Sequence, residues 1–392
     1  MASATPDNHA QPNGNGAPPP AGPLARATPR SRALQRSFGE KMERNISRLP
    51  RRTWDSIRRL LGDNVWKVPH KYLVRTYWMK LGNLAQYPPR PLRTETFPDA
   101  AAIAAEALPP TSLTWRMLGG TPPAPRVTAD ADLPHIAIVT PSFQHAAYIR
   151  ETMDSVLNQG YPNLSYVVQD GGSNDGTREI LEDYAPRLHA CGSEKDRGQA
   201  EAIRNGFERT EGRGEIMAWL NSDDTLLPGA LHYIGRYFGT HPHVDAIYGH
   251  RILIDERGME IGRWVLPPHN DEPLGFVDYV PQETLFWRRA IYEKVGGIDT
   301  TLRFAMDWDL LLRFVKAKAR IVRVPYFLGC FRVHKQQRSS APVTTMGIHE
   351  MDQIRHDFHG RDLSWDEVNK AARKLQVRAT ITSRLLEMGI RR

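Results

Sequence analysis

The sequence predicts an α/β fold in which a mostly parallel sheet carries helices on both faces. Apolar, strand-like segments alternate with helix-like segments from His135 to about residue 240. Polar side chains directly follow several of these strands, at Thr140, Asp170 and the pair Asp223–Asp224, and parallel sheets bind ligands at such carboxyl ends. Apolar residues make up 40% of the 392 residues, which suffices for a sizeable core.

The N-terminal region departs from this alternation. Residues 1–30 are rich in Pro, Ala, Gly and Asn and are predicted to form a disordered tail. Residues 31–82 interleave Arg and Lys with aromatic and aliphatic residues, and in "HKYLVRTYWMKL" the apolar positions share one helical face. A Pro-rich linker with a short Ala-rich helix at about 98–107 completes this basic extension, which we expect to end near residue 130.

The positive charge of the chain is concentrated in this extension. Residues 1–130 contain 19 Lys and Arg against 9 Asp and Glu, whereas the whole chain has a net charge of +8. Two interpretations are open: the basic helices contact an anionic membrane surface, or they pack on the protein's own core. No motif for nucleic-acid recognition accompanies the charge, so nucleic acid is not an expected partner.

Cysteine content and hydropathy indicate the compartment. Cys191 and Cys330 lie far apart without a metal-binding motif, which fits a reducing environment. No apolar run approaches the roughly 18–20 residues that span a bilayer, and the N-terminus lacks the pattern of a secretory signal. We therefore expect the protein in the cytoplasm, peripheral on the inner face of the cell membrane if the basic helices contact lipid.

Four strands, each followed by a helix, open the α/β region. "HIAIVT" precedes a helix at about 146–158, and "LSYVVQD" leads through the Gly-rich turn "GGSNDG" to a helix at about 176–185. A short strand near 188–191 precedes the helix in "DRGQAEAIRNGFER", and the strand "GEIMAWLN" precedes the helix "GALHYIGRYF". This order is typical of parallel βαβ units.

The pattern changes after residue 245. "IYGHRILIDERGMEIGRWV" predicts an antiparallel strand pair, "PQETLFWRRAIYEKVGGID" a strand with a short helix, and "MDWDLLLRFVKA" an amphipathic helix. "VPYFLGCFRVHKQQRSS" predicts a strand that runs into a basic loop. Ser364 and Glu367 form a capping-box signature for a long C-terminal helix. We thus expect one domain over 131–345 and a helical segment over 346–392.

Two adjacent aspartates, Asp223 and Asp224, stand between an apolar strand and a helix that starts at Pro228. Neighbouring carboxylates repel, so they are best tolerated on a loop that faces water or a cation. Without a Cys or His cluster beside them in the sequence, they fit a Mg²⁺ or Mn²⁺ ion shared with a diphosphate better than a structural metal.

Several motifs occur together in one order: "IVTPSFQHAAYIRETMDSVLNQGYPNLSYVVQDGGSNDGT", "SEKDRGQAEAIRNGF", "WLNSDDTLLPGAL", "FAMDWDLLLRF" and "FRVHKQQRSS". With these motifs, residues 135–340 resemble the family 2 glycosyltransferases of the GT-A (Rossmann-like) fold, in particular bacterial exopolysaccharide and cell-surface glycan types. The resemblance implies inverting, metal-dependent transfer of a sugar from a nucleotide-diphosphate sugar to a hydroxyl of a glycan or lipid-linked acceptor.

The resemblance also implies roles for individual residues. A divalent metal, Mg²⁺ or Mn²⁺, would be held by Asp224 and His334, and Asp223 would contact the ribose or the metal. Asp307 would be the base that deprotonates the acceptor. The acidic residue that usually precedes it in the family motif is replaced here by Met306. Gln282 and Asp309 would lie on the acceptor side. The donor would be bound by Thr140, Pro141, Ser142, Asp170, Asp196, Arg197, Asp223 and Arg338, with Lys335 nearby.

Two alternatives belong to other classes. A sugar-1-phosphate nucleotidyltransferase shares the broad architecture but carries a Gly-rich basic loop after its first strand, which "TPSFQHAAYI" lacks. A non-catalytic scaffold that binds membranes or polyanions through its basic extension would have a degenerate transferase domain, and intact Asp224 and Asp307 argue against it.

Overall fold

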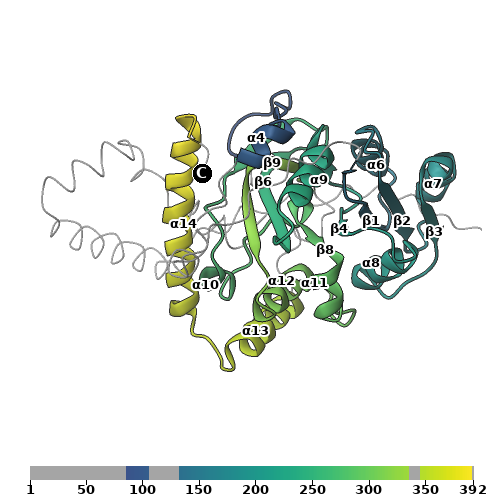
Figure 1. Cartoon of the computed structure of the whole chain (residues 1–392). Coiled ribbons are helices and arrows are strands. Elements are labelled where there is room, and N and C mark those ends of the chain that lie inside the picture. The colour runs from purple at the N-terminus through teal and green to yellow at the C-terminus, as the bar shows by residue number, and fades with distance from the viewer. Residues whose placement is uncertain (1–84, 106–131, 335–344, 391–392) are drawn as a thin grey trace, which may run out of the picture. The chain divides into compact units, whose positions relative to one another are not determined.

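The computed structural model describes residues 85–105, 132–334 and 345–390 (Figure 1). The predicted tail, the basic segment 31–82, most of the Pro-rich linker, and the loop with Lys335 and Arg338 lie outside these residues. The two interpretations of the basic segment therefore stay predictions.

The described residues form a nine-stranded sheet in the order β3-β2-β1-β4-β8-β6-β9-β5, with β7 paired to β6. The strands are β1 Ile136–Ser142, β2 Leu164–Asp170, β3 Ala190–Ser193, β4 Ile216–Trp219, β5 Thr225–Leu226, β6 Ala246–Ile254, β7 Glu260–Trp264, β8 Phe286–Arg288 and β9 Ile321–Arg332. The predicted α/β architecture is confirmed.

The sheet is parallel in its first half and mixed in its second. β1 pairs in parallel with β2 and β4, β2 with β3, and β6 with β9. β8 runs antiparallel to both β4 and β6, and β5 runs antiparallel to β9. The predicted antiparallel pair is confirmed as β6 and β7, whereas β5 is an additional short strand that the sequence pattern does not reveal.

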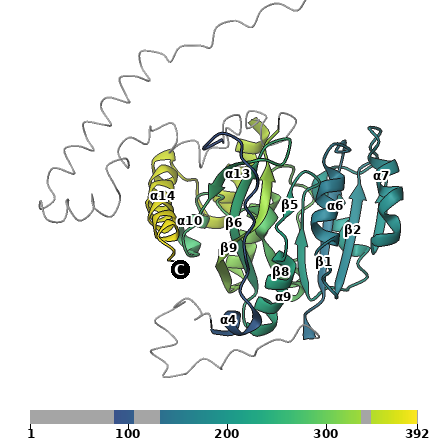
Figure 2. The same ribbon diagram turned by 90° about the horizontal axis from the view of Figure 1, so that it is seen from above.

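Helices cover both faces of the sheet. They are α4 Ala100–Ala105, α6 Ile149–Leu157, α7 Thr177–Tyr184, α8 Gln199–Glu208, α9 Ala230–Thr240, α10 Asp271–Leu274, α11 Arg289–Lys294, α12 Met306–Lys316, α13 Thr345–His359 and α14 Trp365–Glu387. Figure 1 shows α6 and α8 on opposite sides of β1 and β2. The predicted capping box of Ser364 and Glu367 starts α14, and both views place α14 beside α10 (Figure 2).

Alternation along the strands explains this layering. In β1, Val139 belongs to a core that includes α8 and α12, whereas Ile138 belongs to a core that includes α6 and α9. In β2, Val167 and Val168 divide in the same way. Successive side chains of a strand point to opposite faces, so short apolar runs fill both cores.

The carboxyl ends of the central strands meet at one edge. The pairing register places Ser142 opposite Asp170 and Val139 opposite Trp219. The segments that follow these strands, 143–148, 171–176 and 220–224, therefore leave the sheet from a common edge.

Residues 86–93 lie along β7 and are held there by a buried glutamate. Glu260, with 0% exposure, accepts hydrogen bonds from Tyr87 Oη at 2.5 Å, Arg90 Nη2 at 2.6 Å, Arg263 Nε at 2.8 Å and the backbone N–H of Arg93 at 3.1 Å. Burial opposes ionisation, but these hydrogen bonds outweigh it and lower the pKa of the Glu260 carboxyl below its usual value.

We predict that Glu260→Gln lowers the free energy of unfolding by about 3 kcal/mol at pH 7, the lower end for buried pairs because Arg90 and Arg263 are partly exposed. A depressed folded-state pKa stabilises the fold above the unfolded-state pKa and loses this effect as pH falls, so the difference should shrink below pH ~4.5. Denaturant titrations measure it. Glu256→Gln, an exposed glutamate in the preceding turn, should change stability by less than ~0.5 kcal/mol; equal effects of both changes would contradict the prediction.

Candidate active site

A cavity of about 920 Å³ lies at the edge where the central strands end. Many predicted site residues line it: Pro141, Ser142, Asp196, Arg197, Asp223, Asp224, Gln282 and Asp307. Thr140, Asp170, Asp309 and His334 are not among its lining residues, although His334 directly contacts one of them, Asp223. The fold thus brings residues from β1 to α12 into one cavity.

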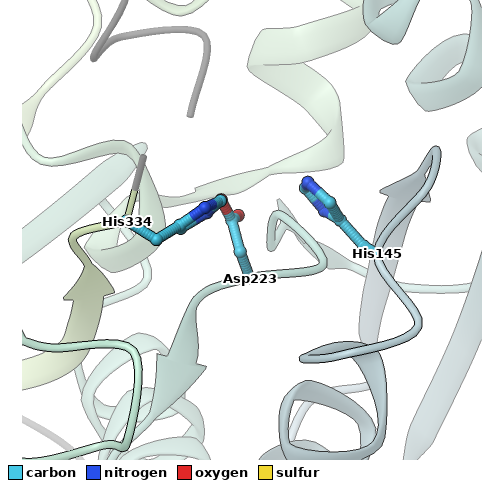
Figure 3. A group of neighbouring side chains, drawn as sticks. All are labelled: His145, Asp223 and His334. Carbon is cyan, nitrogen blue, oxygen red and sulfur yellow. The ribbon is translucent and has the colours of Figure 1, made fainter. Parts of the chain in front are cut away.

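Three side chains converge at one side of the cavity (Figure 3). His334 Nε2 lies 2.9 Å from Asp223 Oδ2, and His145 joins them so that one ligand atom from each residue lies within 4.8 Å of the others. His145 Nδ1 lies 2.6 Å from the hydroxyl of Ser222. Sequence reasoning missed His145; the available signal was a histidine three residues beyond the end of a strand whose carboxyl edge binds ligands.

The two adjacent aspartates face different partners. Asp223 contacts His334, whereas Asp224 Oδ1 accepts a hydrogen bond from the backbone N–H of Arg332 at 3.0 Å and is buried. Burial, with the charges of Asp223 and Glu283, raises the pKa of Asp224 well above its usual value. The histidine that the sequence paired with Asp224 is therefore beside Asp223 in the structure.

Asp307 begins α12 and faces the cavity within a group of charged residues. Burial raises the pKa of its carboxyl above the usual value, although the Trp308 N–H, 2.9 Å from Oδ1, acts in the opposite direction. Asp278 also lines the cavity, and its buried Oδ1 has no hydrogen-bond partner among the described residues. Burial, with the charge of Asp307, raises the pKa of Asp278 well above the usual value.

A buried ion pair completes this group. Arg251 donates from Nε and Nη2 to the two carboxylate oxygens of Glu283, at 2.7 and 2.5 Å, and its guanidinium also lies over the rings of Trp264 and Phe331. Arg251, Glu283 and Asp278 were missed from the sequence because they lie outside the recognised motifs and meet Asp307 only through the fold.

Asp309 forms an ion pair within α12 and does not line the cavity. Its Oδ2 accepts from Nε and Nη2 of Arg313 at 2.9 and 2.7 Å, one helical turn along α12. Gln282, in contrast, lines the cavity: its amide donates to the carbonyl of Trp219 at 2.7 Å, while its buried Oε1 has no partner in the part of the chain that the structure describes.

Two residues predicted to bind the nucleotide sugar, Asp170 and Thr140, make hydrogen bonds within the protein. Asp170 accepts hydrogen bonds from Ser173 N at 2.8 Å, Ser173 Oγ at 2.6 Å and Ser193 Oγ at 2.6 Å, and it is fully buried. Thr140 Oγ1 lies 2.8 Å from Tyr166 Oη. Ser142, by contrast, lines the cavity with a buried hydroxyl that has no partner within residues 85–105, 132–334 and 345–390.

The segment before α8 also borders the cavity. Asp196 Oδ1 accepts from Gly198 N at 2.8 Å, directly before the helix, and exposed Arg197 pairs with Glu201 at 2.8 Å.

Within the ranges described above, no helix has both the length and the apolar character needed to cross a membrane.

Comparison with known proteins identifies a family whose matched region includes several cavity residues. The model of the family "Glycosyl transferase family 2" matches residues 137–294, which include the His145 segment, both adjacent aspartates and Gln282. The chain thus contains a glycosyltransferase family 2 domain over these residues. It is therefore an enzyme, as the sequence predicted.

Curated relatives of this glycosyltransferase are bacterial. A PGL/p-HBAD biosynthesis glycosyltransferase of Mycobacterium bovis is 26% identical over 194 residues, 48% of this chain and 73% of that protein. A putative teichuronic acid biosynthesis glycosyltransferase, TuaG of Bacillus subtilis, is 38% identical over 94 residues, 23% of this chain and 36% of that protein. Among solved structures, S. aureus TarS 1–349 in complex with UDP-GlcNAc aligns over 62% of this chain and 72% of that chain, with 17% identity and a TM-score of 0.49.

Proposed function

We propose that this glycosyltransferase moves a sugar from a nucleotide-diphosphate sugar to a hydroxyl acceptor with inversion at the anomeric carbon. One observation carries the proposal: Asp223, in contact with His334, and Asp307, with a raised pKa, line the same cavity. A single displacement needs a charge-stabilising group on the leaving side and a base on the attacking side. These residues therefore support the proposal of one group for each role.

The leaving side is the edge with Asp223 and His334. A carboxylate oxygen and an imidazole nitrogen 2.9 Å apart, both largely buried, fit a divalent cation in donor type and spacing. When bound there, such a cation would neutralise charge on the departing diphosphate. Arg338 and Lys335 lie outside the described residues, and their contribution to phosphate neutralisation stays a prediction from the sequence.

The attacking side is the group around Asp307. Its carboxylate would accept the proton of the acceptor hydroxyl as the oxygen attacks the anomeric carbon. Burial raises the pKa of Asp307, and a carboxylate with a higher pKa is a stronger base for the acceptor hydroxyl. Arg251, held by Glu283, keeps a positive charge near the acidic residues and limits their mutual repulsion.

Part of the cavity lining is apolar. Val277, Phe304, Met351, Val368 and Ala372 line the cavity and belong to one hydrophobic cluster with Trp308, the neighbour of Asp307; Met351 comes from α13, and Val368 and Ala372 from α14. An acceptor whose hydroxyl is attached to an apolar group would bury that group here. This supports a lipid-linked or glycolipid acceptor. The names of the curated relatives, which concern PGL/p-HBAD and teichuronic acid biosynthesis, support cell-surface glycan synthesis.

The test is a panel of nucleotide-diphosphate sugars with added divalent metal, in which donor binding is measured by calorimetry and product formation by mass spectrometry. We expect one sugar to be transferred with release of nucleoside diphosphate, and NMR of the product to show an inverted anomeric centre. Release of pyrophosphate from a nucleoside triphosphate and a sugar 1-phosphate would instead indicate the nucleotidyltransferase, and binding without turnover the scaffold.

A further inference from the structure

We propose that His145 is a third metal ligand beside Asp223 and His334, and that this set of two imidazoles and one carboxylate selects a divalent transition-metal ion over Mg²⁺. The inference deepens the proposed function, since it concerns the cation of the leaving side. It narrows the choice between Mg²⁺ and Mn²⁺ that the sequence left open.

Three separate segments bring these ligands together. His145 follows β1, Asp223 follows β4 and His334 follows β9, so each stands just past the end of a strand of the same sheet. One ligand atom from each lies within 4.8 Å of the others, and Figure 3 shows the three side chains turned toward a common point. The positions are therefore set by strand pairing and not by one flexible loop.

The surroundings orient the histidines. The side chain of His334 is 1% exposed and that of Asp223 is 10% exposed. On His145, Nδ1 lies 2.6 Å from Ser222 Oγ, and this contact fixes the orientation of the ring beside Asp223 and His334. A hydrogen bond on the second nitrogen is the usual means by which proteins fix the orientation of a metal-binding histidine.

Arg332, at the end of β9, contacts Asp223 through the backbone. Its Nε donates to the backbone carbonyl of Asp223 at 2.9 Å, and its Nη2 pairs with Glu151 at 2.5 Å. The guanidinium thus has a carboxylate partner in Glu151, while Oδ2 of Asp223 contacts His334.

The donor set decides which metal is favoured. Mg²⁺ prefers oxygen ligands and keeps several waters, whereas imidazole nitrogen suits transition ions. For a site with two nitrogen donors among three protein ligands, affinity should rise from Mg²⁺ to Mn²⁺ to Co²⁺, following the usual order for first-row ions. A site with only Asp223 and His334 would discriminate less.

The experiment measures metal binding by the full chain without donor or acceptor. Calorimetry and competition titrations give affinities for Mg²⁺, Mn²⁺ and Co²⁺, and pulsed EPR of bound Mn²⁺ detects coordinated imidazole nitrogens. For the unchanged chain we expect Mn²⁺ to bind at least ~10-fold more tightly than Mg²⁺ and two nitrogens to be coupled. His145→Ala should weaken Mn²⁺ binding at least ~10-fold and remove one nitrogen signal.

Two further variants sharpen the result. His145→Asp exchanges a nitrogen for an oxygen donor and should shift the preference toward Mg²⁺. His349→Ala, an exposed histidine on α13, should leave both affinity and nitrogen count unchanged. Circular dichroism checks that each variant is folded. Equal affinity of the unchanged chain for Mg²⁺ and Mn²⁺, or two nitrogens in folded His145→Ala, would overturn the proposal.

The result is separable from the proposed function. A chain that binds Mn²⁺ through two histidines but transfers no sugar would disprove the transferase mechanism and leave the metal site standing. Sugar transfer with a single coordinated histidine would do the reverse.

Discussion

Replacing Asp307 with asparagine is expected to lower the turnover number by a factor of about 10²–10⁴ while donor affinity changes little. Asparagine keeps the size of the side chain and can still accept the hydrogen bond from the Trp308 N–H, but it cannot take up a proton. Steady-state kinetics with a saturating acceptor and calorimetric titration of the donor separate the two effects.

The pH–rate profile gives a second reading of the same variant. The base works when deprotonated, so the rate should fall as pH decreases through the pKa of Asp307. Burial raises this pKa, and the fall should come above the ordinary aspartate value of about 3.9. The charged groups around it are Arg251, Asp278 and Glu283. The residual activity of Asp307→Asn should lack this acid limb.

Asp309→Asn is the matched control on the same helix. It removes the pair with Arg313, so a small loss of stability is expected, on the order of 0.5 kcal/mol for a partly exposed pair one turn apart. The turnover number and the acid limb should remain. If Asp309→Asn were the more damaging change, the base would have to be reassigned.

The second large effect is expected at Asp223. Asp223→Ala should abolish detectable binding of divalent metal and reduce turnover by a factor of about 10²–10³ or more, because the leaving group loses its charge stabilisation. Metal titration followed by calorimetry and initial rates at saturating metal test both parts. Restoration of normal rates by high metal concentration would contradict a direct ligand role.

Asp224→Asn is the matched variant that tests which of the two aspartates binds the metal. Asparagine can accept the hydrogen bond from the Arg332 N–H, so the local fold should persist and metal affinity should remain within a few-fold of that of the unchanged chain. Loss of metal binding in Asp224→Asn, together with retention in Asp223→Asn, would favour the assignment made from the sequence.

This pair of aspartates illustrates where sequence reasoning stops. The strand before them and the helix after them have clear apolar patterns, and the structure confirms both as β4 and α9. Which carboxylate faces the histidine depends on a hydrogen bond from Arg332, 108 residues away. No local pattern contains that information.

The same limit applies to the sheet. β1, β2 and β4 carry runs of buried, mainly apolar residues, and the strand predicted within "PQETLFWRRAIYEKVGGID" is confirmed as β8. β5 has only two residues, too few for a periodic signal, and it is a strand because β9 pairs with it. Asp278, Glu283 and Arg251 reach the active site only through the tertiary fold, which explains why the motifs omitted them.

β5 has a further consequence. Thr225, directly after the two aspartates, pairs with Cys330, while Arg332 on the same strand binds Asp224. The turn with Asp223 and Asp224 is therefore fixed at its end by pairing with β9. Its carboxylates lose conformational entropy during folding and not when a ligand binds. A turn preorganised in this way cannot easily move to suit different donors. Divergence in sugar preference among related enzymes should therefore arise from the side chains around the turn, while the turn itself keeps its place.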